Sequence, residues 1–364
     1  MSYRLLRPLV FLADPERAHG WGLEALRRLE RLESGRLHKA SALAPLLASL
    51  RGGAADLPPE APVELLGLRF PNRVGLAAGF DKNATCVDGL GALGFGFVEV
   101  GTVTPRPQPG QAKPRVFRLP SAEALINRMG FPNEGAARAA ERLRHRQYRG
   151  IVGVNIGKNA DTPLDRATDD YLACLDTVHA VADYVAVNIS SPNTAGLRDL
   201  QEADRLAPML DALLERRAEL AKTNGREVPL LVKIAPDLTE PAIAAIVGLI
   251  QRSGLDGVIA TNSTVSRQYV GGLEHANEAG GLSGAPLRHL SLHVVRQLRQ
   301  RLGPAFPIIG VGGINSPQAA LEMRVAGADL VQLYTALVYE GPRIVTELRR
   351  ALAPPPTAPA IAAY

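Results

Sequence analysis

Tyr184-Val185-Ala186-Val187-Asn188-Ile189-Ser190-Ser191-Pro192-Asn193 reads as an apolar β-strand that ends in amides and hydroxyls. Such groups at a strand end are suited to hold a flat, hydrogen-bonding ligand. The pattern recurs where other apolar runs lead into Asn155, Lys233, Asn262 and Gly312-Gly313. Because the parallel strands of a barrel place their carboxyl ends around one site, the repetition predicts a parallel barrel with its site at that end.

The chain from about residue 73 onward alternates short β-branched runs with longer amphipathic runs. The predicted strands are Val74–Ala78, Phe97–Val100, Val152–Ile156, Val185–Ile189, Leu230–Ile234, Gly257–Ala260, Pro307–Val311 and Leu330–Leu333. The predicted helices span 134–148, 167–182, 204–222, 239–252, 286–302 and 316–326. This alternation favours an α/β fold, a (β/α)8 TIM barrel, over an open sheet. The long connections 102–133 and 262–285 fall on the carboxyl side, and Val63–Phe70 predicts a hairpin that plugs the amino end.

The first 50 residues do not follow this alternation. An apolar stretch, Leu5–Leu12, comes first, Trp21–Leu29 shows helical spacing among arginines, and Leu43–Leu50 suggests a second helix. Amphipathic helices with a basic flank suit an anionic membrane surface or packing on the barrel, and the pattern alone favours neither. The expected organisation is a helical extension at 1–52, a barrel at 60–352 and a Pro-rich flexible tail at 353–364.

Composition narrows the classes of partner. The 364 residues are 46% hydrophobic and 21% charged, as in a soluble globular protein, with a net charge of +5 and a pI near 9.3. A basic chain can bind nucleic acid, an anionic membrane surface or an anionic substrate. Much of the excess charge falls in residues 1–40, and no basic RNA-binding domain appears, so no nucleic-acid partner is expected. The cysteines and histidines show no metal-like spacing, so neither a disulfide nor a metal is expected.

Several strand ends carry groups that suit a phosphorylated, ring-containing ligand. Gly312-Gly313 and Tyr334-Thr335 match the usual phosphate site of such barrels, where backbone N–H groups bind the phosphate. The side-chain amides of Asn155, Asn188 and Asn262, each at a strand end, can hydrogen-bond to a ring that bears C=O and N–H groups. Taken alone, an Asn in such a position more often caps a turn. A cation such as Lys233 beside a reducible ring stabilises the anion formed on reduction.

Ser191 is the candidate acid–base group. A serine is a poor base without help, which Thr194 or a chain of waters would supply. The alternative is that Ser191 only shapes a turn. Ala77–Lys82, whose small residues allow close approach to a ligand, and Asn127–Phe131, which offers an amide and a guanidinium, are weak signals taken singly.

Taken together, these motifs resemble the dihydroorotate dehydrogenase family from about residue 3 to about residue 350. Asn188–Asn193 resembles the loop that carries the active base. In this family, the soluble classes carry Cys at the position of the base, and the membrane-linked, quinone-using class 2 carries Ser. The resemblance at Ser191 is therefore to class 2. Asp14–His19 also resembles that class, in which two amino-terminal helices form a membrane-facing quinone tunnel. The resemblance therefore favours the membrane reading for residues 1–50.

The resemblance also implies roles for individual residues. FMN would be held by Ala77, Ala78, Gly79, Phe80, Asp81, Thr102, Asn155, Asn188, Lys233, Thr261, Gly284, Gly312, Gly313, Tyr334 and Thr335. Dihydroorotate would be held or bordered by Lys82, Asn127, Arg128, Met129, Gly130, Phe131, Asn188, Asn193, Asn262 and Ser263. Ser191 would take the C5 proton while the C6 hydride passes to flavin N5, and the electrons would then pass to ubiquinone or menaquinone.

The expected activity is therefore oxidation of dihydroorotate to orotate in pyrimidine (UMP) synthesis. The expected state is a monomer bound peripherally to the cytoplasmic face of the cell membrane. Three alternatives remain at this point. One is a soluble dihydroorotate dehydrogenase that uses fumarate or NAD, one is an FMN-dependent tRNA reductase, and one is a barrel that binds a phosphorylated ligand without catalysis.

Overall fold

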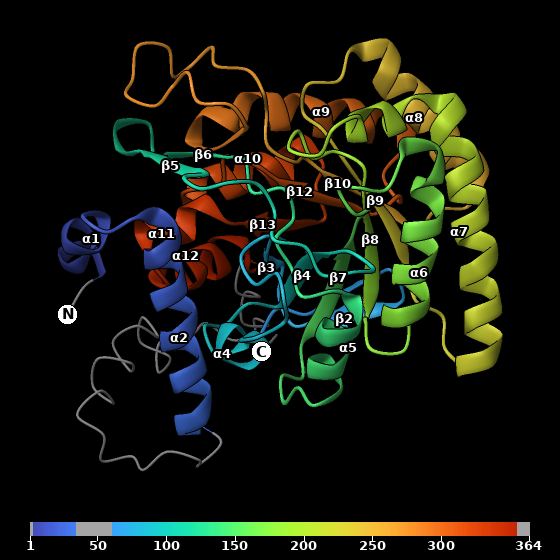
Figure 1. Cartoon of the computed structure of the whole chain (residues 1–364), viewed down its shortest axis with the longest axis horizontal. Coiled ribbons are helices and arrows are strands. Elements are labelled where there is room, and N and C mark those ends of the chain that lie inside the picture. Colours follow the sequence, from blue (N-terminus) through green and yellow to red (C-terminus); the bar gives the residue numbers. More distant parts are fainter. Residues whose placement is uncertain (1–2, 34–59, 355–364) are drawn as a thin grey trace, which may run out of the picture.

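The structure, a computed structural model, describes residues 3–33 and 60–354 (Figure 1). Eight parallel strands close into a barrel in the order β3, β4, β7, β8, β9, β10, β12, β13, which confirms the predicted fold. Their bounds are Val74–Leu76, Phe97–Val103, Ile151–Ile156, Tyr184–Asn188, Leu230–Ile234, Gly257–Ala260, Ile308–Val311 and Leu330–Leu333. Each predicted strand is present, although β3 ends two residues earlier than expected.

Helices surround the barrel on its outside (Figure 1). They are α4 Val87–Gly91, α5 Ala136–Arg144, α6 Ala167–Val178, α7 Ala203–Asn224, α8 Glu240–Ser253, α9 Arg288–Leu302, α10 Pro317–Ala326, α11 Thr335–Glu340 and α12 Arg343–Leu352. Local chemistry sets several ends. The hydroxyls of Thr239 and Ser316 accept backbone N–H groups at the starts of α8 and α10, and Gly254 and Gly327 end these helices in left-handed conformations. The helix expected from residue 134 begins at Ala136.

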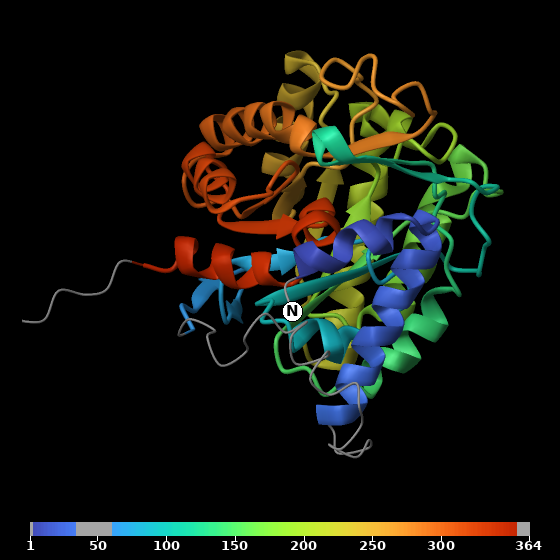
Figure 2. The same cartoon turned by 90° about the vertical axis from the view of Figure 1, so that its left-hand side faces the viewer.

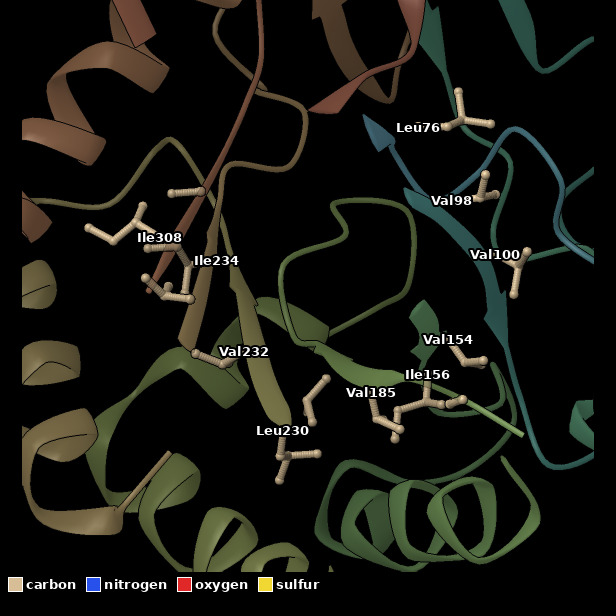
Figure 3. Packing of buried hydrophobic residues seen from close by; sticks show 14 of the residues in the cluster. Leu76, Val98, Val100, Val154, Ile156, Val185, Leu230, Val232, Ile234 and Ile308 are labelled. Atoms are coloured by element: carbon tan, nitrogen blue, oxygen red, sulfur yellow. The ribbon is translucent and has the colours of Figure 1, made fainter. Parts of the chain in front are cut away.

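Side chains of the barrel strands alternate between two cores. On β4, Phe97 points into the barrel, whereas Val98 and Val100 belong to the core between the strands and the helices. Figure 3 shows members of that outer core, such as Val98, Val154 and Val232. The short hairpin of β1 Val63–Leu65 and β2 Leu68–Phe70 places Phe70 edge-on against Phe97, with ring centroids 5.3 Å apart. This contact confirms the predicted plug at the amino end.

A second sheet lies over the carboxyl end of the barrel and was not predicted. Strands β5 Val116–Leu119 and β6 Ala124–Asn127 form a hairpin, and β11 Gly281–Gly284 adds to it in antiparallel fashion. These strands occupy the two long connections that were expected to be loops. Because β11 and β6 are more than a hundred residues apart in the sequence, no local pattern could predict that they pair.

Two amino-terminal helices, α1 Tyr3–Phe11 and α2 Pro15–Glu33, pack beside α11, α4 and β5. Figure 2 views the molecule from this side. The apolar stretch at Leu5–Leu12, whose pattern specifies no secondary structure, is thus mostly helix. The helix suggested at Leu43–Leu50, the rest of residues 34–59 and tail residues 355–364 lie outside the described residues. Within the described part of the chain, no helix has the length and apolar character needed to cross a membrane.

Candidate active site

A cavity of about 170 Å³ opens at the carboxyl ends of the strands. Most residues singled out from the sequence line it, although they come from all parts of the barrel. These are Ala77, Ala78, Gly79, Lys82, Thr102, Asn127, Met129, Gly130, Phe131, Asn188, Ser191, Asn193, Lys233, Thr261, Asn262, Ser263, Gly284, Gly312, Gly313, Tyr334 and Thr335. The parallel barrel therefore gathers groups that are up to about 260 residues apart in the chain.

Three buried polar side chains on one side of the cavity form a closed set of hydrogen bonds. The hydroxyl of Thr102 donates to Asn155 Oδ1 at 2.5 Å, and Asn188 Nδ2 donates to the same oxygen at 3.1 Å and to Thr102 Oγ1 at 2.9 Å. Asn155 does not itself line the cavity but lies behind Thr102 and Asn188. Each amide is thus held in one orientation, as a site that recognises a polar ring requires.

The loop after β8 places its hydroxyls beside amides from other strands. Asn262 Nδ2, after β10, donates to Ser190 Oγ at 3.0 Å and to Asn188 Oδ1 at 3.3 Å. Ser191 is 4% exposed, and its Oγ accepts the backbone N–H of Asn193 at 3.2 Å. A hydrogen bond donated to this oxygen favours its deprotonated form. The neighbouring hydroxyl of Thr194 is buried without a hydrogen-bond partner among the described residues.

Lys82 stands at the edge of the cavity. Its ammonium donates to the carbonyl of Gly79 at 2.5 Å. Burial is the main cause that lowers the pKa of Lys82 from its ordinary value to about 8, with Arg115 adding to the effect and Glu16 and Asp81 opposing it. Lys82 therefore changes its charge near physiological pH, and it offers a cation to an anionic ligand on the acid side of that value.

Four residues predicted to belong to the site lie behind the cavity lining. Besides Asn155, these include Asp81, whose carboxylate accepts the backbone N–H groups of Thr85 and Cys86 and so orders the turn before α4. Phe80 packs edge-on against Tyr334. Arg128 points away, toward Glu278 at 2.7 Å and over the ring of Phe117.

One end of the cavity is built from glycines in conformations that other residues rarely adopt. Gly312 has φ +117°, and a Cβ atom there would lie 2.1 Å from Ser291 Oγ. Gly313 has φ +71°, and its Cβ would lie 2.5 Å from the backbone of Arg288. The guanidinium of Arg288 donates to Gly313 O and to Asn315 Oδ1, which puts a positive charge beside this end. An exposed backbone and a nearby guanidinium suit a phosphate.

A second cavity, of about 290 Å³, lies between the amino-terminal helices and the barrel. Its lining is largely apolar and includes Leu6, Val10, Ala25, Leu26 and Leu337. His19 packs edge-on against Phe80 here, and burial together with the charge of Lys82 lowers the pKa of His19 to about 4. The imidazole is therefore neutral at physiological pH, in keeping with an apolar chamber. The two cavities share the residues Lys82, Val116, Leu125, Met129 and Tyr334.

Glu99 is the residue of this region that sequence reasoning missed. It lies on β4 inside the barrel, fully buried, with side chains from β7, β8, β9 and β13 donating to its carboxylate. A signal existed in Val98-Glu99-Val100, since a carboxylate in an apolar strand needs buried partners. The described residues hold no group of three or more His, Cys, Asp and Glu side chains placed to bind a metal, and both cysteines are free and buried.

A closed parallel barrel with a polar cavity at the carboxyl ends of its strands, a glycine-built end that suits a phosphate and a buried serine is typical of the cofactor-binding (β/α)8-barrel enzymes. Comparison with known proteins gives the particular family. The sequence profile described as dihydroorotate dehydrogenase matches residues 61–354. The chain belongs to the dihydroorotate dehydrogenase family, whose members are flavoenzymes, and its relatives place it in the quinone-dependent class 2.

The relatives match over nearly their whole length. A dihydroorotate dehydrogenase (quinone) of Chromobacterium violaceum is 55% identical over 97% of this chain and 98% of its own. One of Thiobacillus denitrificans is 53% identical over 97% of this chain and 100% of its own. A solved structure from Eimeria tenella, in complex with ferulenol, is 37% identical and has a TM-score of 0.81, covering 93% of this chain and 91% of that one.

Proposed function

We propose that this chain oxidises dihydroorotate to orotate and passes the electrons to a membrane quinone. The observation that carries this proposal is that a polar cavity and an apolar cavity lie side by side and share lining residues. One is polar and holds Ser191, while the other is apolar and opens between the amino-terminal helices. An enzyme that takes a polar anion on one side and a lipid-soluble acceptor on the other needs such a pair.

The cofactor of the proposed reaction is FMN, and the residues present fit it. Gln332 and Asn193 line the polar cavity, and each has a buried side-chain oxygen without a hydrogen-bond partner among the described residues, as expected if a ligand donates to it. The glycine end would take the phosphate, and Thr102, Asn188 and Lys233 would hold the ring. When bound, the flavin supplies a ring that accepts a hydride from one substrate and gives up electrons to another.

The remaining groups of the polar cavity suit dihydroorotate. Lys82 would neutralise its carboxylate, and the amides of Asn127, Asn193 and Asn262 would read its ring C=O and N–H groups. Asn193 Nδ2 already donates to Asn127 Oδ1 at 3.2 Å, which holds both amides in place. Ser191 Oγ would take the C5 proton. The backbone N–H of Asn193 would stabilise the oxygen while the unpartnered hydroxyl of Thr194 would help carry the proton away.

The amino-terminal helices suit a lipid surface. Leu5, Leu9 and Leu12 recur at helical spacing along α1 and its end and are 70%, 67% and 85% exposed, and Trp21 of α2 is 60% exposed. Exposed apolar side chains of this size next to arginines are typical of helices that lie in a membrane interface. We propose that this face rests on the cytoplasmic side of the cell membrane, so that the quinone enters the apolar cavity from the bilayer.

Absorbance of the bound flavin tests the proposal directly. The purified protein is mixed anaerobically with dihydroorotate, and a short-chain quinone is then added. Bleaching by dihydroorotate and recovery with quinone, but not with fumarate or NAD, is the expected result. Bleaching without recovery by quinone would refute the quinone assignment. No bleaching in a yellow protein would refute dihydroorotate as the substrate.

A further inference from the structure

The barrel interior contains a buried charge pair below the polar cavity. Glu99 is fully buried, and Lys233 is 5% exposed, with 3.5 Å between Lys233 Nζ and Glu99 Oε1. Phe97 points into the barrel, and Glu99 follows it by two residues, so the alternation of strand β4 directs the carboxylate inward as well. Burial of a carboxylate is strongly unfavourable unless it is paired and hydrogen-bonded.

Both oxygens of Glu99 have two partners. Oε1 accepts from Asn155 Nδ2 at 2.8 Å in addition to Lys233, and Oε2 accepts from Gln332 Nε2 at 2.7 Å and from the hydroxyl of Tyr184 at 3.0 Å. Burial, and then the adjacent carboxylate, raises the pKa of Tyr184 well above its ordinary value, so the phenol stays protonated and donates. The four donors come from four different strands, which makes Glu99 the centre of the network.

This network leads directly to the cavity. Lys233 and Gln332 line it, and Asn155 is bonded to Thr102 and Asn188, which line it too. The carboxylate therefore determines where the Lys233 ammonium and the Asn155 amide sit, although it does not line the cavity itself.

We propose that Glu99 is a positioning residue that orients Lys233 and Asn155 and partly neutralises the Lys233 charge, and that it thereby sets the reduction potential of the bound flavin. The inference rests on the proposed flavin site. Reduction adds negative charge to the ring, which the ammonium of Lys233 stabilises and the carboxylate of Glu99 opposes. Removal of the carboxylate charge should therefore make the flavin easier to reduce.

Glu99→Gln is the variant that tests this. It keeps the size of the side chain, and its new NH2 group can donate to the hydroxyl of Tyr184, which accepts as well as donates. The potential of the bound flavin is measured against a reference dye, and the FMN dissociation constant by fluorescence. We expect reduced flavin to bind at least about tenfold more tightly relative to oxidised flavin, which corresponds to a rise of about 30 mV for a two-electron couple.

Tyr184→Phe is the matched control. It removes one donor to the same carboxylate and leaves its charge, so it should lower thermal stability while it changes the binding ratio by less than about twofold, or about 9 mV. An equal shift in the control would mean that packing, not charge, governs the potential, and would overturn the inference. An unchanged potential in Glu99→Gln would overturn it as well. Failure of the wild-type protein to bind FMN would instead refute the proposed function.

If Glu99→Gln does not fold, the charge pair can be removed as a whole. The double variant Glu99→Gln with Lys233→Gln leaves no unpaired buried charge, and it is compared with Lys233→Gln alone. The single variant, which keeps the uncompensated carboxylate, should have the lower potential, again by a ratio of about tenfold or about 30 mV. Equal potentials in the two variants would overturn the inference.

Discussion

The polar cavity in the barrel mouth and the apolar cavity under the amino-terminal helices meet at Tyr334, yet they are held together differently. The first is lined by side chains at the ends of rigid strands, and its amides are locked to one another by hydrogen bonds. The second is closed by two helices that dock through side-chain contacts. A flat polar ligand needs fixed donors and acceptors, whereas a lipid-soluble ligand needs an accessible apolar space.

Helices α1 and α2 are held on the barrel by ion pairs and hydrogen bonds between side chains and the backbone. Glu16 of α2 binds Arg115 at 2.6 Å and Lys113 at 3.4 Å, Arg4 of α1 binds Glu340, and Arg118 donates to the carbonyls at the end of α1. Apart from the largely buried Arg115–Glu16 pair, these ion pairs are partly exposed, so each of the others contributes at most about 1 kcal/mol. The helices should thus respond to sequence changes more readily than the barrel mouth, and the two sites should be separable by mutation.

The largest separation is expected from Ser191→Ala. Loss of the base should slow flavin reduction by dihydroorotate by about 10²–10⁴-fold, because general base catalysis contributes a factor of this size. FMN should remain bound, and reoxidation by quinone should be unchanged. Stopped-flow absorbance of the flavin measures both half-reactions. Ser191→Cys, which keeps an ionisable group, should lose less activity. Reduction of Ser191→Ala at near the wild-type rate would show that another group takes the proton.

The opposite separation should come from filling the apolar cavity. Gly22 lines it, and no heavy atom lies within 4 Å of the position of an added Cβ. A phenyl group from Gly22→Phe would occupy the space proposed for the quinone at a cost of about 1–3 kcal/mol, so the KM for quinone should rise about fivefold to 150-fold. Flavin reduction by dihydroorotate should be unchanged.

Gly20→Phe is the matched control for this change. Gly20 lies on the same helix, has equally free space at its Cβ position and does not line the cavity. Steady-state kinetics with a short-chain quinone should therefore leave its KM near wild type. The same KM increase in both variants would mean that the phenyl group disturbs helix α2 and does not block a quinone site.

A pH titration tests the role of Lys82, which lines both cavities. Burial holds the pKa of Lys82 near 8, below its ordinary value, so its ammonium is present below that pH and is lost as the pH rises through it. If the ammonium binds the substrate carboxylate, the dissociation constant of dihydroorotate should rise about tenfold from pH 7 to pH 9. Lys82→Met should bind weakly at both pH values. A wild-type affinity that does not change with pH would exclude Lys82 as the carboxylate ligand.

The smallest effect is expected at the phosphate end. Thr335 Oγ1 lies 2.9 Å from Ser283 Oγ, and Thr335→Ser keeps this hydroxyl while it removes only a methyl group. The FMN dissociation constant, followed by fluorescence, should change by less than about fivefold, since loss of one methyl group costs about 1 kcal/mol or less. A larger loss would mean that the methyl group packs against the cofactor.

Most strands of the barrel can be predicted from the sequence, because the patterns that indicate them are local. A buried parallel strand is a short apolar run, and Val232 leading into Lys233, or Val187 into Asn188, marks both the strand and the end at which its ligands lie. No such local pattern indicates the β5–β6–β11 sheet, because β11 is a strand only through its pairing with β6, which is distant in sequence. Phe80 and Asp81 show the same limit, since adjacency to Gly79 in sequence did not place them in the lining of the polar cavity, and Phe80 lines the apolar cavity instead.

The sequence by itself determined the alternating pattern, the polar strand ends and the serine of the loop after β8, since these depend on the residue and its immediate neighbours. Only the tertiary structure decided which polar groups meet. Glu99 is one carboxylate among 36 acidic residues until barrel closure surrounds it with donors from four other strands. The apolar cavity likewise exists only because helices α1 and α2 dock on the barrel, and docking depends on contacts between residues as far apart as Arg4 and Glu340.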